Sequence, residues 1–386
     1  MGRGPAGMKK AMLAAGMLPA LIAVGSLPTG AAGTTLAAQH GGRQLLTQPL
    51  PPPEDSRSFS RDERASTEAE QVLAARIRSL GDNFNGDVGI AVRDVETGFA
   101  ATFDGDTFFP QQSVSKFWVA LTALDAADRG ELDLDQRVTL TRSDLTLFHQ
   151  PIAQQIGSGS YSTTLNALIF RAMTQSDNTC NDFVLRRAGG PEAVRAFLRR
   201  RNIEGIRFGP GERLMQSALA GMSWRPEYSV GRAFYTARAN VPEPVRRAAF
   251  ERYVADPVDG ATPRGIVGAL SRLQRGELLT PHSTRRLLSI MSQTRTGRQR
   301  LTGGVPAGWR IAHKTGTGQV YGSTQTGYND IGIVTAPDGS SYAVAVMIRR
   351  TAAPLGERMQ LMQNTVRAIA EYHRNQSGGS GNNYSR

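Results

Sequence analysis

Residues 87–103, with the sequence DVGIAVRDVETGFAATF, decide the fold of this chain. Two segments of it, Val88–Val95 and Phe99–Phe103, show strand-like alternation on either side of Glu96-Thr97-Gly98. This pattern predicts a β-hairpin. Because an isolated hairpin is at best marginally stable in water, the two strands need partners from elsewhere in the chain. The next segments with strand character begin more than 200 residues later.

These later strand patterns are Trp309–His313, Ile331–Thr335 and Tyr342–Ile348. With the hairpin they predict one antiparallel sheet of about five strands, which brings the two ends of the domain together. Helical patterns at about 67–80 and 355–372 are expected to cover one face of the sheet. The middle, about 113–293, is mainly helical in pattern. We therefore predict an α+β fold, an α/β sandwich with a central all-α lobe and an active site in the cleft between lobe and sheet.

The first part of the chain has the composition of an export signal. Arg3, Lys9 and Lys10 precede an apolar run over about 11–27, and small residues follow it. Residues 1–38 are therefore predicted to be a signal peptide, and the protein to be periplasmic or secreted. A retained N-terminal anchor is the alternative interpretation of the same run.

Two further segments have the composition of disordered chain. Residues 39–66 are rich in Pro, Gly, Gln, Ser and charge, and residues 375–386 are nearly all Ser, Gly, Asn and Arg. We expect a disordered linker and a disordered tail. The domain itself is predicted to span 67–374, with an insertion at about 217–261.

The chain is basic, with a formal net charge of +12. Its arginines are scattered and no nucleic-acid-binding signature accompanies them, so no nucleic-acid partner is expected. Attraction to an anionic cell wall or to a small carboxylate substrate explains the charge better. No later segment is long and apolar enough to predict stable membrane insertion. We expect a monomer.

No metal or other cofactor is expected. His282 and His373 have no partners at metal-ligand spacing, which disfavours a zinc hydrolase, and no Gly-rich phosphate loop occurs. The single cysteine, Cys180, excludes an internal disulfide and is expected to be a packed thiol. His313 precedes Lys314 on a predicted strand, so it should point to the opposite face, into the core.

Ser113-Val114-Ser115-Lys116 offers a nucleophile and a base. Ser113 and Lys116 are three residues apart at a predicted helix start after Phe109-Pro110, so both side chains leave the same face of the first turn. A serine hydroxyl needs a neighbouring base at neutral pH, and a lysine can serve where burial or positive neighbours keep it partly neutral. Ser113 is the candidate nucleophile and Lys116 its candidate base.

Ser176-Asp177-Asn178 interrupts the helical pattern that runs from Leu165 to Met173. Three short polar residues in such a place are typical of a turn or a helix N-cap. In a functional interpretation, Ser176 relays a proton to the leaving nitrogen, and Asn178 donates to a substrate amide carbonyl. Asp177 is expected to hold the loop through local hydrogen bonds.

Lys314-Thr315-Gly316-Thr317 continues the predicted strand that begins at Trp309. Gly316 is expected to let an extended ligand approach the backbone, and the amide of Thr317 can join that of Ser113 as an oxyanion hole. Lys314 and the hydroxyls of Thr315 and Thr317 predict a pocket for a substrate carboxylate.

In this order and at this spacing, the three motifs resemble those of the class A serine β-lactamases and their penicillin-binding relatives. The resemblance runs from about Glu68 to Tyr372. It implies that a small-molecule β-lactam acylates Ser113 and that water then releases the acyl group. A D,D-peptidase that acts on peptidoglycan peptides is the first alternative, and a non-catalytic β-lactam-binding sensor is the second.

Deacylation separates these possibilities, because the lactamases of the family add a glutamate that activates water. Trp224–Glu227 (WRPE) resembles the family's Trp-Glu-Pro-Glu string, but Arg225 stands where the base should be. Glu212–Gln216 (ERLMQ) matches the pattern Glu-x-x-Leu-Asn with conservative changes, and the ungapped spacing from Ser176 falls on Glu212. We favour Glu212 as the base, with Gln216 in place of the asparagine that helps to hold the water.

Three questions about this loop stay open at this stage. Gly209, Pro210 and Gly211 replace residues that usually brace it, so a surface glutamate in a turn is the alternative for Glu212. Whether Lys116 or Glu212 is the acylation base is not decided by the motifs. His149 falls where the family has an aromatic residue at the cleft entrance, and it is expected to line the mouth without catalysing.

The insertion at about 217–261 is longer than the family's pattern needs. A short amphipathic helix is predicted over Pro244–Val254. We expect its aromatic residues to pack over the loop rather than recognise substrate; they are Trp224, Tyr228, Phe234, Tyr235, Phe250 and Tyr253.

Overall fold

The computed structural model describes residues 67–379. The predicted signal peptide (1–38), the predicted linker (39–66) and residues 380–386 of the predicted tail lie outside the described residues. Within 67–379, no helix is both long enough and apolar enough to cross a membrane.

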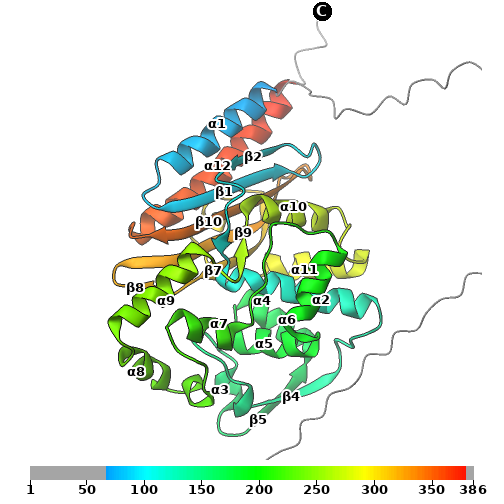
Figure 1. The fold of residues 1–386 in the computed structure, drawn as a ribbon. Helices are drawn as coiled ribbons and strands as arrows, with labels where there is room; N and C mark the ends of the chain where they lie inside the picture. The colour runs from blue at the N-terminus through cyan, green and yellow to red at the C-terminus, as the bar shows by residue number, and fades with distance from the viewer. Residues whose placement is uncertain (1–66, 380–386) are drawn as a thin grey trace, which may run out of the picture. The chain divides into compact units, whose positions relative to one another are not determined.

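A central antiparallel sheet joins the first and last strands of the domain (Figure 1). Its order is β2 (Ala100–Phe103), β1 (Asp87–Asp94), β10 (Ser341–Thr351), β9 (Thr324–Thr335) and β7 (Arg310–Thr317). A short strand, β8 (Val320–Tyr321), also pairs with β9. In the β1–β10 pair, Ile90 lies opposite Val346. The predicted hairpin and its distant partners are therefore confirmed.

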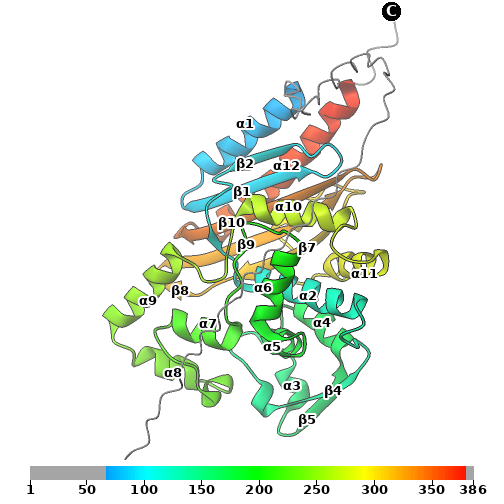
Figure 2. The same cartoon turned by 45° about the vertical axis from the view of Figure 1, so that its right-hand side comes forward.

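One face of the sheet is covered by the two terminal helices, as predicted (Figure 2). Both α1 (Glu68–Asp82) and α12 (Leu355–Gly379) lie there side by side. A capping box between Thr67 and Glu70 starts α1. The last helix continues past its predicted end at Tyr372 and includes residues 375–379, whose composition predicts a disordered tail.

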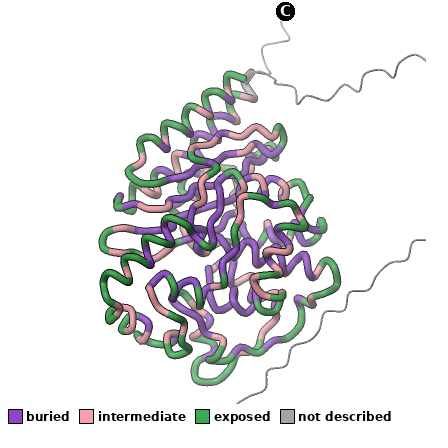
Figure 3. Tube along the Cα trace, in the orientation of Figure 1, coloured by how far each residue is buried: buried purple, intermediate pink, exposed green. Residues whose placement is uncertain are grey.

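The other face packs against the helical lobe. Alternation along β1 divides the core, because Ile90 and Val92 join the cluster under α1 and α12, whereas Ala91 joins the cluster on the lobe side. The helix α2 (Lys116–Asp128) is buried at every residue from Lys116 to Ala126. It therefore runs through the interior, where the chain trace is mostly buried (Figure 3).

The remaining helices of the lobe and of the sheet's second face follow in chain order: α3 (Ala153–Ile156), α4 (Leu165–Thr174), α5 (Asn178–Arg187), α6 (Gly190–Arg200), α7 (Glu212–Leu219), α8 (Ala233–Ala239), α9 (Glu243–Ala255), α10 (Pro263–Gln274) and α11 (Pro281–Ser292). The predicted helix in the insertion is confirmed as α9.

Two small two-stranded sheets were not predicted. The strand β4 (Arg137–Thr141) pairs with β5 (Ser160–Thr164), and β3 (Phe109–Pro110) pairs with β6 (Gly260–Ala261). Segments this short give weak periodicity, which explains the omission. The β3–β6 pair matters for the site, because it fixes the return of a long loop beside the turn that carries Ser113.

Candidate active site

The candidate nucleophile lies on a short 3₁₀ turn between β3 and α2. Ser113 follows Gln112, whose φ of 52° lies in the left-handed region. Lys116 is the first residue of α2, and its Nζ lies 2.8 Å from the Ser113 Oγ. The three-residue spacing thus brings amine and hydroxyl into contact, with the lysine only 1% exposed.

Glu212 contacts the same amine. It is the first residue of α7, it is buried, and its carboxylate pairs with the Lys116 Nζ. One turn further on, the Gln216 Nε2 donates to the Glu212 Oε2 at 3.2 Å. Carboxylate, amine and the Ser113 hydroxyl therefore form a continuous chain of hydrogen bonds.

Two alternatives are tested by this geometry: that Glu212 lies in a surface turn, and that Glu227 is the base in its place. Glu212 is 3% exposed, so the surface-turn interpretation is wrong. The competing candidate, Glu227, has a side chain that is 57% exposed and lies 3.8 Å from Arg225. Within residues 67–379, Glu227 makes no hydrogen bond or ion pair to Ser113 or Lys116.

Asp182, on α5, holds the start of α7 in place. Gly211 is the N-cap of α7 and has no side chain to cap it. Instead, the Asp182 carboxylate accepts the backbone N–H groups of Glu212 at 3.1 Å and Arg213 at 3.4 Å. Burial, together with the nearby charge of Glu212, raises the pKa of Asp182. The motif analysis missed this residue, since the cap comes from another helix.

Ser176 and Asp177, in the turn between α4 and α5, make different contacts. Ser176 has a φ of 60°, and its Oγ accepts a hydrogen bond from the Lys314 Nζ at 3.0 Å. Asp177 caps α5 by accepting the Cys180 N–H at 3.0 Å, and it also accepts the Ile152 N–H at 2.7 Å. Its predicted role in holding the loop is confirmed.

Asn178 and His149 lie next to each other at the cavity. The backbone N–H of Asn178 donates to the carbonyl of His149 at 2.9 Å, and its side-chain Nδ2 donates to the carbonyl of Leu147 at 2.8 Å. The His149 Nε2 lies 2.8 Å from the carbonyl of Gln175. Both side chains line the cavity, so the predicted position of His149 is confirmed.

Lys314 is fully buried behind Ser176. Its Nζ donates to the Ser176 Oγ and, at 2.8 Å, to the carbonyl of Thr315. Burial, reinforced by the charge of Lys116, lowers the pKa of Lys314 well below its usual range. An amine that loses its proton readily, in contact with the Ser176 hydroxyl, is suited to a proton relay.

Arg300 is a cation at the end of β7 that the motif analysis missed. Its Nη1 donates to the carbonyls of Gly316 at 2.9 Å and Asn329 at 2.7 Å, and its Nη2 donates to the Thr317 Oγ1 at 2.6 Å. The guanidinium also lies 3.8 Å from the ring centroid of Tyr328. Because Arg300 precedes β7 and belongs to none of the motifs, only the folded chain reveals it.

Position 316 must be glycine because another segment of the chain's own backbone lies against it. A Cβ at this position would lie 2.3 Å from the carbonyl oxygen of Gln111 and 3.2 Å from the nitrogen of Val114. The absence of a side chain therefore lets β7, with Thr317, lie directly beside the turn that carries Ser113.

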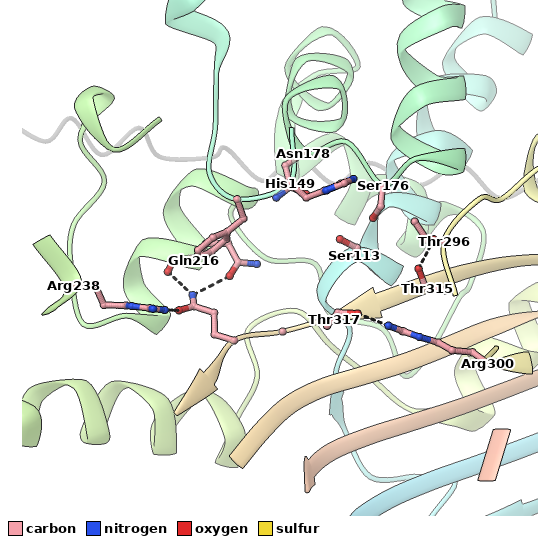
Figure 4. Close-up of a pocket in the computed structure, with 13 residues that line it drawn as sticks. Ser113, His149, Ser176, Asn178, Gln216, Arg238, Thr296, Arg300, Thr315 and Thr317 are labelled. Atoms are coloured by element: carbon pink, nitrogen blue, oxygen red, sulfur yellow. Dashed lines mark hydrogen bonds between the residues drawn. The ribbon is translucent and has the colours of Figure 1, made fainter. Parts of the chain in front are cut away.

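A cavity of about 430 Å³ opens in front of Ser113 (Figure 4). Its lining includes the predicted residues Ser113, His149, Ser176, Asn178, Gln216, Thr315 and Thr317. It also includes Phe148, Arg238, Thr296, Arg300, Gly318 and Gln319, which were not predicted. Lys116, Glu212 and Lys314 are buried behind this lining and bond to the side chains of Ser113, Gln216 and Ser176.

The insertion packs over the loop, as expected for its aromatic residues. Phe250 and Tyr253 of α9 cluster with Met215 of α7. Phe234 of α8 packs against Leu147. One residue departs from the expectation of a purely structural insertion, because Arg238 of α8 lines the cavity.

Tyr253 also joins the insertion to the nucleophile turn. Its Oη donates to the Asp259 Oδ1 at 2.9 Å and accepts a hydrogen bond from the Gln112 Nε2. Asp259 Oδ2 accepts the Gln112 N–H at 2.8 Å, and Gln112 Oε1 accepts from the Gln216 Nε2 at 2.8 Å. Complete burial raises the pKa of Asp259 to about 6. One network thus connects the nucleophile turn, α7 and the insertion.

Two residues were expected to be structural, and both are. His313 is buried, with its Nδ1 2.9 Å from the Asp330 Oδ1. Cys180 is buried, and burial raises the pKa of its thiol well above the usual range. In the part of the chain that the structure describes, His, Cys, Asp and Glu side chains form no group of three or more that could hold a metal ion.

Comparison with known proteins finds similarity to beta-lactamases in both sequence and structure. The model of the Beta-lactamase enzyme family matches residues 71–373. Beta-lactamase VEB-1 of Pseudomonas aeruginosa is 25% identical over 279 residues, which cover 72% of this chain and 82% of that protein. Extended-spectrum beta-lactamase PER-1 of the same organism is 26% identical, covering 73% and 80%. A solved beta-lactamase from Chitinophaga pinensis is 27% identical with a TM-score of 0.61, covering 78% and 96%.

Proposed function

The chain belongs to the class A beta-lactamase family of serine hydrolases, and from that premise we propose that it hydrolyses the β-lactam amide of penicillin- and cephalosporin-type antibiotics. The observation that carries this proposal is the buried Glu212, in contact with Lys116 and Gln216 beside Ser113. A hydrolase needs a base for the second, deacylating step as well as for the first.

In the acylation step, the Ser113 Oγ attacks the lactam carbonyl and gives its proton to Lys116 or Glu212. Lys116 contacts the Ser113 hydroxyl directly, and Glu212 is hydrogen-bonded to Lys116, so Glu212 can receive the proton through Lys116. The backbone amides of Ser113 and Thr317 stabilise the oxyanion. Ser176, in contact with Lys314, delivers a proton to the ring nitrogen as the C–N bond breaks.

In the deacylation step, Glu212 removes a proton from water, which attacks the acyl carbonyl and restores Ser113. Gln216 supports this step from the same helix. Its Nε2 donates to Glu212, and its side chain lines the cavity. Because both Nε2 hydrogens are donated, to Glu212 and Gln112, the Gln216 Oε1 is the group proposed to accept a hydrogen bond from the water between the carboxylate and the ester.

The substrate carboxylate is proposed to bind at the end of β7. The hydroxyls of Thr315 and Thr317 line the cavity there, with Arg300 beside them. Two hydroxyl donors and a guanidinium suit a carboxylate. The acyl side chain then extends toward Asn178 and Gln216. We also propose a periplasmic or secreted setting, which rests on the N-terminal sequence pattern.

A chromogenic cephalosporin tests the proposal. Purified protein is expected to release many equivalents of product, and Ser113→Ala to release none. A single equivalent of product, with a persistent adduct on Ser113, would contradict hydrolysis. In that case, release of D-alanine from a peptide ending in D-Ala-D-Ala would identify a wall peptidase, and its absence would favour a β-lactam-binding sensor.

A further inference from the structure

Arg238 is a residue of the inserted segment (217–261) that lines the cavity in front of Ser113. Among the described residues that line the cavity, it is the one that comes from 217–261. It lies on α8, a short helix held by packing of Phe234 against Leu147 and Ala220. The packing of the insertion therefore fixes one cation at the cavity wall.

The positive charge of Arg238 has no partner of opposite sign in the described chain. Its Nη1 donates to the neutral Gln319 Oε1 at 3.2 Å, and its guanidinium lies 5.5 Å from the ring centroid of Tyr235. Within residues 67–379, no carboxylate lies at ion-pair distance from it. Partial burial, with the nearby charge of Arg246, lowers the pKa of Arg238. A partly desolvated guanidinium of this kind gains most from an anionic ligand.

Arg238 and Arg300 stand at opposite ends of the cavity (Figure 4). Ser113 and Gln216 lie between them. The two cations differ in their surroundings. Arg300 donates to two backbone carbonyls and to Thr317, whereas Arg238 has one hydrogen bond to a neutral amide. The cavity therefore offers an anion two separate positions.

The proposed function assigns the Arg300 end to the ring carboxylate of the substrate. The acyl side chain then extends past Gln216 toward Gln319 and Arg238. Gln319 donates a hydrogen bond to Gln216 and accepts one from Arg238. We propose that Arg238 binds a second carboxylate, carried on the acyl side chain, and that the enzyme favours such dianionic β-lactams over their monoanionic counterparts. This inference rests on the proposed function, from which it takes the orientation of the substrate.

Two penicillins that differ by one group provide the test. Carbenicillin carries a carboxylate on the carbon next to the side-chain carbonyl, and benzylpenicillin carries hydrogen there. The second-order rate constant for acylation of Ser113 is measured for each by competition with a fluorescent penicillin. Arg238→Gln is expected to lower the ratio of the carbenicillin constant to the benzylpenicillin constant about ten-fold, as loss of a charged hydrogen bond at a partly exposed site implies. Arg238→Lys should restore part of it.

Arg252→Gln is the matched control. Arg252 is exposed on α9 of the same insertion, it does not line the cavity, and its loss changes the net charge equally. It should leave the ratio within about two-fold. An unchanged ratio in Arg238→Gln, or an equal fall in Arg252→Gln, would overturn the inference.

Measuring acylation separates this inference from the proposed function. If both penicillins acylate Ser113, the ratio shifts as expected, but product is not released repeatedly, the inference holds and the hydrolase proposal fails. If product is released repeatedly and the ratio is unchanged, the hydrolase proposal holds and the inference fails. If neither penicillin acylates Ser113, both fail.

Discussion

The carboxylate of Asp182, on α5, accepts the backbone N–H of Glu212, the first residue of α7, at 3.1 Å. Through this contact the helix that follows Ser176 and Asp177 positions the carboxylate that contacts Lys116. The position of the proposed base thus depends on a residue outside all three motifs.

Asp182→Ala is expected to slow deacylation more than acylation, by about 10- to 100-fold, because a small displacement of Glu212 misaligns the water. Loss of the cap should also lower the free energy of unfolding by about 1–2 kcal/mol. Pre-steady-state kinetics with a chromogenic cephalosporin separates the two steps. Asp182→Asn keeps one acceptor oxygen and should be milder; equal loss in both variants would argue against the capping role.

Removal of one hydroxyl tests the link between the insertion and the nucleophile turn. Tyr253→Phe keeps the ring in its cluster with Met215 but leaves Gln112 and Asp259 without their shared partner. The free energy of unfolding, measured by urea denaturation, should fall by about 1–3 kcal/mol. The control is Tyr235→Phe, at a ring that is 44% exposed, where a change within about 0.5 kcal/mol is expected. Equal effects at the two positions would show that the network does not stabilise the fold.

Asp259 gives the fold a predictable response to pH. Its pKa of about 6 in the folded chain lies above the 3.8 of an exposed aspartate, so the folded state binds the proton more tightly than the unfolded state does. The resulting stability is fully present below pH 3.8 and is lost as pH rises through about 6. The loss is about 3 kcal/mol.

Asp259→Asn removes this titration while it keeps the shape of the side chain and one of its two acceptor oxygens, so the lost hydrogen bond costs the same at every pH. Urea denaturation at pH 4 and pH 7.5 is expected to show the variant gaining stability relative to the unmodified protein at the higher pH. Parallel changes in the two proteins would show that Asp259 does not titrate in this range.

Arg300 is expected to contribute to binding of the substrate carboxylate. Arg300→Gln should lower kcat/KM for a cephalosporin by about 10- to 100-fold, mainly through KM, because a charged donor is lost. The matched control is Arg298→Gln, at an exposed position outside the cavity lining. Because Arg300 also bonds the carbonyls of Gly316 and Asn329, thermal unfolding should be measured alongside. An unchanged KM in a folded variant would assign Arg300 to structure alone.

The sequence predicted those features whose signals are local. Alternation along residues 88–103 predicted the hairpin, and the three-residue spacing of Ser113 and Lys116 predicted their contact. Gly316 was also expected to allow a close approach. The approach that the structure shows is that of the Gln111 carbonyl, which the sequence did not predict, because a sequence does not show which backbone segment will lie against a strand.

The features that were missed are those that the tertiary fold creates. Asp182 caps a helix 30 residues away, Arg300 reaches β7 from outside the motif, and Arg238 enters the cavity on a short inserted helix. Each is a common residue type in an unremarkable local sequence. Only the packing of separate segments gives it a role at the site.

The central claim is that Glu212 makes this chain a hydrolase rather than a protein that β-lactams block. The most direct measurement is the intact mass of the protein over time after mixing with a cephalosporin, for the unmodified protein, Glu212→Gln and Glu227→Gln. The account predicts a stable acyl mass on Glu212→Gln and a rapid return to the free mass in the other two. A persistent adduct on the unmodified protein, or on Glu227→Gln in place of Glu212→Gln, would contradict it.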